Sequence, residues 1–466
     1  MSDNNLVLEL FGLEDADVLS ADYINQNGNA VIDVFLTPKA TPCPSCGCDK
    51  PKVKCYVTKK INHAVLSDRK CTLNYHARRY KCPVCDRTYY EHNPFVFGAS
   101  KISALTVLNV VKDLKNYNET FSSVAQRYYI SPTTTQSIFD KYVHMARTPL
   151  PEYLCIDECY SFTHKLEKSK YVCMILDFKS QKPVDLLPSR RKEYLLNYFR
   201  SIPIEERRQV KMCSSDMWET YRDVFKTIFP SALHCVDHYH LSQELVRVVD
   251  SIRIQVMKSC HKFSDDKKIT DDYYLLKNFN WLLFKRFDSK DKDGTFTLDP
   301  SRKMSFNRHF NQYLNYFQIR NKILAIDPKL EFACNLWDDF VDLYEKNTID
   351  TIEESLNELI EKYSDTGIKE INGFIRTVRS WKKEIKNSFI IINYKHKIIK
   401  DTGEVAISPT KLNNGLMENR NAILKCIKKN SNGYSNWDRF RNRCLYVLRK
   451  DAVPLLNPIT NERKPS

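Results

Sequence analysis

Two pairs of cysteines at metal-ligand spacing constrain the fold of this chain more than any other feature. Cys43 and Cys46 form one C-x2-C knuckle, and Cys82 and Cys85 form a second after 35 intervening residues. Because each such turn points two thiolates at one centre, the pairs together predict one tetrahedral zinc ion. With four protein ligands the site has no open position, so we expect it to support folding rather than catalysis. Three other cysteines are alternative ligands: Cys48, Cys55 and Cys71.

Positive charge is concentrated in two stretches of the chain. Residues 39–150 carry 18 Lys or Arg against 7 Asp or Glu, and residues 419–450 carry nine against one. Such clustering is typical of proteins that bind a polyanion, so we expect double-stranded DNA as a partner, with solvated helix faces as the alternative. Residues 1–38, by contrast, hold seven acidic residues and no Lys or Arg. We expect them to form a separate acidic segment that could dock on a basic surface.

The sequence carries no export or membrane signal that we can identify. No apolar run approaches the roughly 18 residues that a membrane span needs, and the N-terminus lacks a basic start. We therefore expect a cytoplasmic protein without a membrane partner. In that compartment the sixteen cysteines stay reduced, and most of those outside the knuckles are expected to be small core residues.

Helical periodicity begins after the cysteine-rich module. Apolar residues recur at helical spacing over 103–115, a short helix is expected at 121–130, and Ser131 with Pro132 begins a third helix. Any three-helix bundle gives a similar pattern, but beside a basic metal-binding module this one favours a helix-turn-helix. Its last helix would present four side chains to the base edges of DNA: Thr133, Thr134, Thr135 and Gln136.

Seven segments after residue 150 follow the order strand, strand, strand, helix, strand, helix, strand. Three antiparallel strands followed by alternating helices and strands are typical of ribonuclease-H-like nucleases. We therefore expect an α/β fold whose core is a ribonuclease-H-like mixed sheet. The segments are 152–162, 169–180, 182–188, 192–202, 209–216, 218–229 and 232–240.

Three carboxylates lie where such a core needs metal ligands. Asp157 is on the first, central strand, Asp216 follows the fourth strand, and Glu418 falls in the first turn of a C-terminal helix. Carboxylates on adjacent strands can hold two magnesium or manganese ions about 4 Å apart. Spacing alone does not choose among the acidic residues, and four others remain candidates: Glu158, Glu219, Asp223 and Asp237.

The long helical stretch after residue 245 predicts an insertion into the core. It is rich in aromatic residues at helical spacing, and one polar segment, 288–303, is expected to be a loop. The predicted units are, in order, the acidic segment 1–38, a zinc-binding domain 39–98, a helix-turn-helix domain 99–146, the first part of the catalytic core 150–245, an all-helical insertion 246–412, the last core helices 413–450 and a tail 451–466.

Five sequence blocks carry a family resemblance. They are CPSCG…RRYKCPVCDRTYYE, IDECYSF, YVCMILDFKSQKPVDLLPSRRKEYL, SDMWETYRDVFKTIFPSALHCVDHYHL and NGLMENRNAILKCIKKNSNGYSNWDRFRNR. In this order they resemble the DDE transposases of bacterial insertion sequences, most of all the ISL3-type group, over residues 40–450. The resemblance implies a zinc-binding N-terminal domain, a helix-turn-helix and an interrupted ribonuclease-H-like core.

The resemblance also implies roles for single residues. The three acidic positions of the family motifs fall on Asp157, Asp216 and Glu418, which would be the catalytic, magnesium-binding triad. Three further residues resemble positions near the family's active site and are treated as auxiliary: His240, Asp237 and Arg190.

The implied activity is DNA transposition. Such an enzyme binds terminal inverted repeats, hydrolyses a phosphodiester with two metal ions and joins the freed 3′-hydroxyl to target DNA. We expect it to act as a homodimer or higher oligomer on DNA, in the bacterial nucleoid. A DNA-binding transcriptional regulator derived from a transposase, and a structure-selective nuclease, are the alternatives. The residues expected to contact DNA are Arg78, Arg79, Arg127, Thr133, Thr134, Thr135, Gln136, Lys425, Lys428 and Lys429.

Overall fold

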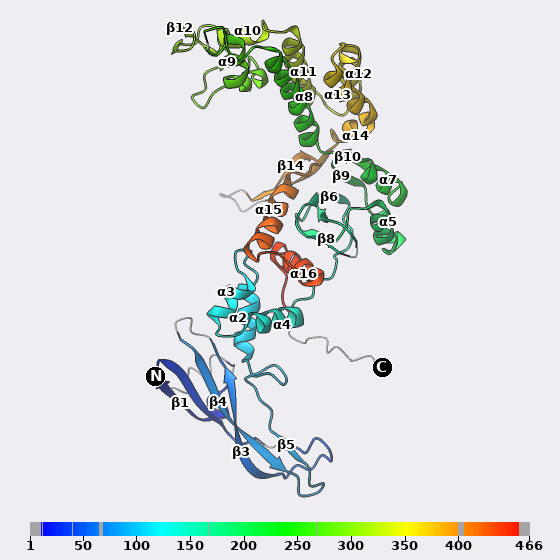
Figure 1. Cartoon of the computed structure of the whole chain (residues 1–466). Coiled ribbons are helices and arrows are strands. Elements are labelled where there is room, and N and C mark those ends of the chain that lie inside the picture. Colours follow the sequence, from blue (N-terminus) through cyan, green and yellow to red (C-terminus); the bar gives the residue numbers. More distant parts are fainter. Residues whose placement is uncertain are drawn as a thin grey trace.

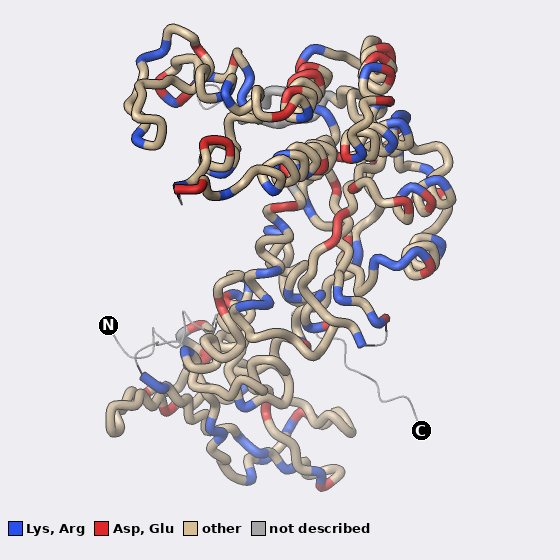
Figure 2. Tube along the Cα trace, turned by 45° about the horizontal axis from the view of Figure 1, so that its top comes forward, with Lys and Arg blue, Asp and Glu red and all other residues tan. Residues whose placement is uncertain are grey.

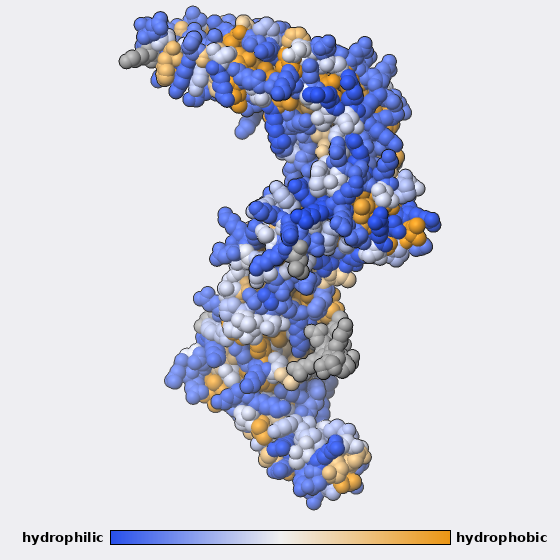
Figure 3. Space-filling model, turned by 45° about the vertical axis from the view of Figure 1, so that its right-hand side comes forward, coloured by the Kyte–Doolittle hydropathy of each residue, from blue (hydrophilic) through white to orange (hydrophobic). Residues whose placement is uncertain are grey.

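The computed structural model arranges the chain as an elongated series of units (Figure 1). An N-terminal sheet lies at one end, three short helices follow, a second sheet lies near the centre, and the helices of the insertion form the other end. The face drawn in Figure 3 is mostly hydrophilic, with scattered apolar patches. None of the described helices is both long and apolar enough to span a membrane. The structure describes residues 11, 13–39, 41–64, 69–165, 167–266, 268–398 and 405–455.

The N-terminal sheet joins the acidic segment to the cysteine-bearing strands. Its order is β1-β2-β4-β3, with β5 paired to β4, and β2 lies parallel to β4 from the pair Ala30–Cys71 to the pair Val34–Tyr75. The expectation of a separate segment 1–38 is therefore wrong. Alternate apolar residues of this segment enter the core of the sheet, a period-two pattern that its acidic composition obscured. The strands are β1 (Val18–Gln26), β2 (Asn29–Leu36), β3 (Lys52–Asn62), β4 (Cys71–Lys81) and β5 (Thr88–Tyr90), after a 3-10 turn, η1 (Asp15–Asp17).

Three short helices connect this sheet to the centre of the molecule. Each begins at a hydroxyl side chain that accepts a backbone N–H of the first turn, namely Ser103, Thr120 and Ser131. The predicted helix start at Ser131 and Pro132 is confirmed. The helices are α2 (Ala104–Asp113), α3 (Phe121–Arg127) and α4 (Pro132–Tyr142).

The central sheet is mixed, and β6 is its middle strand. The order is β10-β9-β6-β7-β8; β6, β7 and β8 are antiparallel neighbours, whereas β6, β9 and β10 run parallel. Successive side chains of β6 face opposite layers: Leu154 and Ile156 pack with α5 and α7, and Cys155 and Cys159 pack with the C-terminal helices. The elements are β6 (Tyr153–Cys159), β7 (Val172–Asp177), β8 (Pro183–Leu187), α5 (Lys192–Arg200), α6 (Ile204–Arg208), β9 (Met212–Ser215), α7 (Glu219–Ile228) and β10 (Leu233–Val236).

The insertion is mainly helical and has its own apolar core. Two hairpins within it show that the expectation of an all-helical insertion is wrong in detail. The 391–398 stretch alternates apolar and polar side chains, which suits a strand, although its Ile and Lys content also suits a helix. The predicted loop at 288–303 contains no described helix or strand. The elements are α8 (His238–Ser259), α9 (Asp271–Asn278), η2 (Asn280–Phe284), β11 (Ser305–Asn307), β12 (Gln312–Leu314), α10 (Tyr316–Leu324), α11 (Pro328–Lys346), α12 (Ile352–Tyr363), α13 (Lys369–Ser380), α14 (Lys382–Asn387), β13 (Ile391–Ile398) and β14 (Val405–Lys411).

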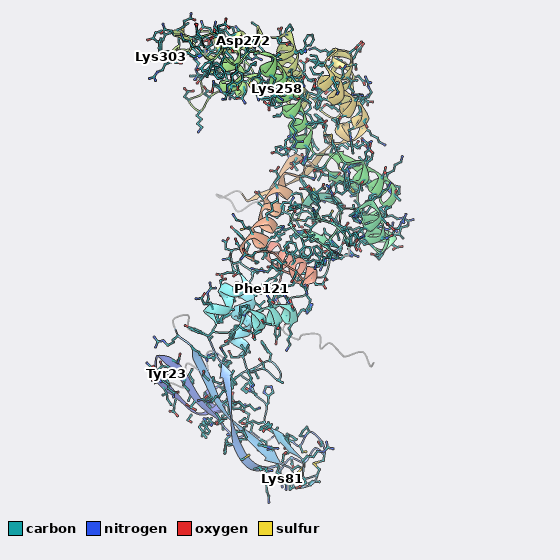
Figure 4. The ribbon with its side chains drawn as sticks, in the orientation of Figure 1. Tyr23, Lys81, Phe121, Lys258, Asp272 and Lys303 are labelled. Carbon is teal, nitrogen blue, oxygen red and sulfur yellow. The ribbon has the colours of Figure 1, made fainter. Side chains whose placement is uncertain are left out.

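The last two helices, α15 (Gly415–Asn430) and α16 (Trp437–Leu448), bind the short helices to the central sheet. Side chains of α2, α4, β6, α15 and α16 share one apolar core. The guanidinium of Arg443 is buried and donates to the carbonyl oxygens of Asn116 and Glu119, each at 2.9 Å. Phe121, labelled in Figure 4, lies at the start of α3 and packs edge-on against Tyr434. The three-helix unit therefore has a fixed position on the core.

A buried histidine marks the contact between the N-terminal sheet and α2. Nδ1 of His63 lies 2.9 Å from Oγ of Ser103, and backbone bonds join Asn62 to Lys101 and Ser103. Burial lowers the pKa of His63 to about 4. The folded contact therefore keeps this imidazole neutral.

We expect this contact to open more readily in mild acid. Because the unfolded imidazole titrates near pH 6.5 and the folded one near 4, the opening free energy should fall by about 1.6 kcal/mol between pH 6.5 and 5. Native-state hydrogen exchange at the amides of Asn62 and Ser103 measures it. The His63→Gln protein should lack most of this pH dependence, and an unchanged slope there would contradict the assignment.

Candidate metal centres

The four knuckle cysteines converge at the outer end of the N-terminal sheet. Their sulfur atoms all lie within 4.8 Å of one another, with 3.6 Å between Cys43 and Cys85 and 3.5 Å between Cys46 and Cys82. Four thiolates at about 2.3 Å from a tetrahedral ion lie at comparable separations, so the cluster fits such an ion. Figure 4 labels Lys81 at this end of β4, directly before the second knuckle.

The two knuckles repeat the same backbone geometry. The N–H of Gly47 bonds to the oxygen of Cys43, and the N–H of Asp86 bonds to the oxygen of Cys82. Gly47 and Asp86 both have positive φ, which turns the chain back after each pair. The N–H of Cys85 is the main reason that the pKa of Cys82 is lowered to about 6. The N–H of Cys48 acts to lower the pKa of the neighbouring Cys46, but the contact with Cys82 and burial outweigh it and raise that pKa. The cluster therefore holds thiolate at Cys82 and thiol at Cys46, and a metal would displace the remaining protons.

The alternative thiol ligands lie elsewhere among the described residues. Cys71 is buried in the core of the sheet, which raises its pKa to about 11. Cys55 is exposed on β3, and neither Cys55 nor Cys48 belongs to the converging group.

A group of carboxylates lies at the carboxyl ends of adjacent parallel strands. One oxygen from each of Asp157, Glu158 and Asp216 lies within 4.8 Å of the others. Asp157 is on β6 and Asp216 directly follows β9, its parallel neighbour, so the sheet itself brings the two together. Burial and the nearby Asp216 raise the pKa of Asp157 to about 7. Such mutual repulsion is what a bound cation would relieve.

His240 and Asp237 occupy the start of α8, beside this group. Nε2 of His240 lies 2.6 Å from Oδ1 of Asp216. Burial acts to lower the pKa of His240, but Asp216, Asp237 and Asp157 together outweigh it and raise that pKa. Asp237 follows β10 and accepts the N–H of Tyr239 as the N-cap of α8. Burial opposes the charge of Asp237, but His238 and this N–H hold its pKa below the ordinary value.

The side chain of Glu158 is held on the face of the central sheet that packs against α7. Its carboxylate pairs with Arg190 and accepts the hydroxyl of the buried Tyr221 at 2.5 Å. Because both oxygens already have strong partners, Glu158 is less available to a metal than Asp157 and Asp216. Arg190 is thus placed beside the carboxylate group. The remaining competitors are surface residues: Glu219 is exposed, and Asp223 pairs with Lys192 at 2.6 Å.

Helix α15 packs on β6 through two asparagines. Nδ2 of Asn414 donates to the oxygen of Ile156 at 3.0 Å, and Nδ2 of Asn421 donates to Oδ2 of Asp157 at 2.7 Å. The Oδ1 atoms of both asparagines are buried without a hydrogen-bond partner. These orphaned oxygens beside Asp157 fit a site that accepts a cation or its water ligands.

Glu418 lies on α15 between these asparagines, but its carboxylate is exposed and is not part of the converging group. Spacings of seven and four residues place Glu418, Lys425 and Lys429 along one edge of the helix. Lys425 and Lys429 are exposed, and Lys428 lies over the ring of Tyr160 at 5.0 Å. The structure therefore places Glu418 in the first turn of α15 and outside the group formed by Asp157, Glu158 and Asp216.

Several side chains expected to contact DNA instead form ion pairs or are buried within the protein. Arg78 is buried and paired with Glu91 at 2.7 Å, and Arg127 pairs with Asp113 and Glu119. These two arginines hold elements together and offer little charge to a phosphate.

On α4 the predicted side chains divide between core and surface. Thr135 is fully buried, and Oε1 of Gln136 accepts Nη1 of Arg439 at 3.0 Å. Thr133 is exposed and Thr134 half-buried. Arg79 is half-buried and donates to Thr88. Thr135 and Gln136 are therefore not free to reach a base in this arrangement, and Thr133 is.

Asn421 is the contact to Asp157 that the sequence reasoning did not single out. Its signal was present, because Asn421 is the last position of the N-G-x-x-E-x-x-N block and follows Glu418 by nearly one helical turn.

One family model, a transposase of the ISL3-type DDE group, matches residues 154–444. The match runs from β6 into α16 and includes Asp157, Asp216 and Glu418. The cysteine cluster and the three short helices lie outside it. No curated protein matches the chain.

Proposed function

The chain belongs to the ISL3-type family of DDE transposases, and from that premise we propose that it cuts and joins DNA strands at a pair of divalent metal ions. The observation that carries the proposal is the convergence of Asp157 and Asp216 at the ends of adjacent strands within the matched residues. The mixed strand order of the central sheet supports a ribonuclease-H-like core.

The donor set suits magnesium or manganese, because it consists of carboxylate and amide oxygens without thiolates or a free imidazole. Two ions held by Asp157, Asp216 and Glu418 would supply charge to activate the attacking oxygen and to stabilise the leaving oxygen. Asn421 fixes the orientation of Asp157 through its 2.7 Å bond. The imidazole of His240 lies in an ion-pair contact of 2.6 Å with Asp216 and limits the movement of that carboxylate. Both act as positioning residues.

Glu418 is proposed as the third ligand, brought in when DNA binds along α15. Its edge of the helix also carries Lys425 and Lys429, whose ammonium groups suit phosphate contacts. A strand lying along this edge would bring its phosphates past Glu418 toward Asp157.

The proposed reaction has two phosphodiester exchanges. In the first, a water oxygen attacks the phosphorus at the element end, the bond to the 3′ oxygen breaks, and a free 3′-hydroxyl results. In the second, that hydroxyl attacks a phosphodiester of target DNA and displaces its 3′ oxygen. No residue of the chain becomes covalently attached. Because two ends must be joined, we propose a dimer or a larger assembly on DNA.

The N-terminal units are proposed to read the terminal inverted repeats. The cysteine cluster would hold one zinc ion that orders the basic end of the sheet, where Figure 2 shows Lys and Arg along the strands. The helices α2 to α4 would form the helix-turn-helix, with the exposed Thr133 near the start of α4.

A pair of variants on α4 separates base reading from phosphate binding. Thr133→Val should weaken binding to the element ends by about 1–3 kcal/mol while leaving binding to unrelated duplex unchanged. Lys141→Ala, exposed on the same helix, should weaken both and reduce the salt slope by about one. Fluorescence anisotropy at several salt concentrations measures both. Equal losses on both DNAs for Thr133→Val would refute the base contact.

The proposal is tested by cleavage of labelled DNA that carries the element's own ends. Magnesium-dependent nicking at the repeat boundary is the expected result. Specific binding without cutting under any divalent metal would instead favour the transcriptional regulator.

A further inference from the structure

A basic cavity lies next to the carboxylate group, on the side of β7 and α5. Its volume is about 470 Å³, within the range of small-ligand sites. Within the described part of the chain, the ammonium groups of Lys168 and Lys170 have no carboxylate partner. No acidic residue lines the cavity, and five of its lining residues are cationic: Lys168, Lys170, Arg190, Arg191 and Lys192.

Two aromatic rings and Ser169 form the rest of the wall. The guanidinium of Arg190 lies between the two rings, 4.0 Å from the ring centre of Tyr171 and 4.7 Å from that of Trp218. The ion pair between Arg190 and Glu158 holds the guanidinium in this position. Because the guanidinium occupies the space between the rings, a base can stack only on a ring face turned away from Arg190, and Trp218 lines the cavity.

The cavity is connected to the proposed catalytic centre by short chain links. Trp218 follows Asp216 by two residues, and Arg190 contacts Glu158, the neighbour of Asp157. The cavity therefore borders the carboxylate group through the pairing of Arg190 with Glu158.

We infer that this cavity binds one unpaired nucleotide of the DNA strand that is cut at the carboxylate centre. The lysines and Arg191 hold its phosphate, and its base stacks on the face of Trp218 that Arg190 does not cover. A base inside a duplex cannot reach such a wall, so the nucleotide must leave the helix. The inference rests on the proposed function and adds a base-binding subsite to it.

The test is binding of a short labelled oligothymidylate to the full-length protein in EDTA, where no cutting occurs. A strand of the same length with abasic sugars carries the same phosphates and no bases. Wild type should bind the thymidylate about 10-fold more tightly than the abasic strand, as expected for one stacked base. Trp218→Leu should remove this preference and leave binding of the abasic strand unchanged.

The surface variants keep the test independent of any folding defect in Trp218→Leu. Lys168→Ala with Lys170→Ala should weaken both strands several-fold, whereas Lys165→Ala, exposed in the same turn but outside the cavity lining, should not. No base preference in wild type, or equal losses from Lys165→Ala, would overturn the inference. Displacement by thymidine monophosphate as effective as by the strand would show a free-nucleotide site instead. A normal base preference without metal-dependent cleavage would refute the proposed function alone.

Discussion

Asp216→Ala should lower the rate of strand cleavage at the element ends by about 10³-fold or more, because bound divalent ions supply several kcal/mol of transition-state stabilisation. Asp157→Ala should have an equal effect, since both carboxylates face the same centre. Cleavage of end-labelled DNA with magnesium, under single-turnover conditions, measures the rate. Manganese should not restore it, because the ligand itself is missing.

Binding to the element ends should survive both substitutions, since the proposed reading units lie outside the central sheet. Removing either carboxylate also relieves repulsion in a buried pair, so neither variant is expected to unfold. The matched control is Asp223→Ala, an exposed acid on α7 whose only ion-pair partner among the described residues is Lys192. Cleavage at the wild-type rate in Asp216→Ala, or a comparable loss in Asp223→Ala, would contradict the assignment of the metal ligands.

The carboxylate pair was predictable because it depends on local order along the chain. When two neighbouring parallel strands each have an acidic residue near their carboxyl end, the two side chains lie at the same end of the sheet, whichever residues surround them. The knuckle cysteines were predictable for the same reason, since each turn fixes its own two sulfurs. Alternation along β6 also separates Asp157 from Glu158: the first meets Asn421 of α15 and the second meets Tyr221 of α7.

The DNA-contact residues were less predictable because their exposure depends on packing partners. On β4, buried and half-buried residues alternate up to Ala77, but Ala77 and Arg78 are both buried, so the alternation is displaced by one residue from there on. The register of β3 against β4 shifts nearby, between Val53 and Cys55, and such an irregularity leaves no clear compositional signal. The burial of Thr135 did have a signal, because it shares helical spacing with Ile138 and Tyr142 of the buried face.

Glu418 shows a different limit. Sequence blocks place it in the first turn of α15, and the structure agrees, but its carboxylate is exposed and outside the converging group. Position along a helix can be predicted from sequence, whereas the direction in which an exposed side chain points cannot.

Replacement of Cys82, a proposed zinc ligand, by serine should abolish stoichiometric metal binding by the N-terminal sheet. Structural zinc is worth about 10–16 kcal/mol of apparent binding free energy in small zinc-dependent folds, so serine at this position should leave no stoichiometric ion. Zinc content of the purified protein measures this directly. We also expect end binding to weaken by about 10-fold or more, since the basic residues near the knuckles lose their fixed positions.

The loss of order should stay local. The core of the N-terminal sheet is formed by residues such as Leu73, Tyr75 and Phe95 and does not include the knuckle cysteines. In Cys82→Ser, exchange protection should therefore disappear at the amides of Gly47 and Asp86, which close the two turns, and persist along β2. Cys55→Ser, an exposed thiol on β3, is the matched control and should keep zinc, protection and DNA binding. One bound zinc in Cys82→Ser, or its loss in Cys55→Ser, would show that a different set of thiols holds the metal.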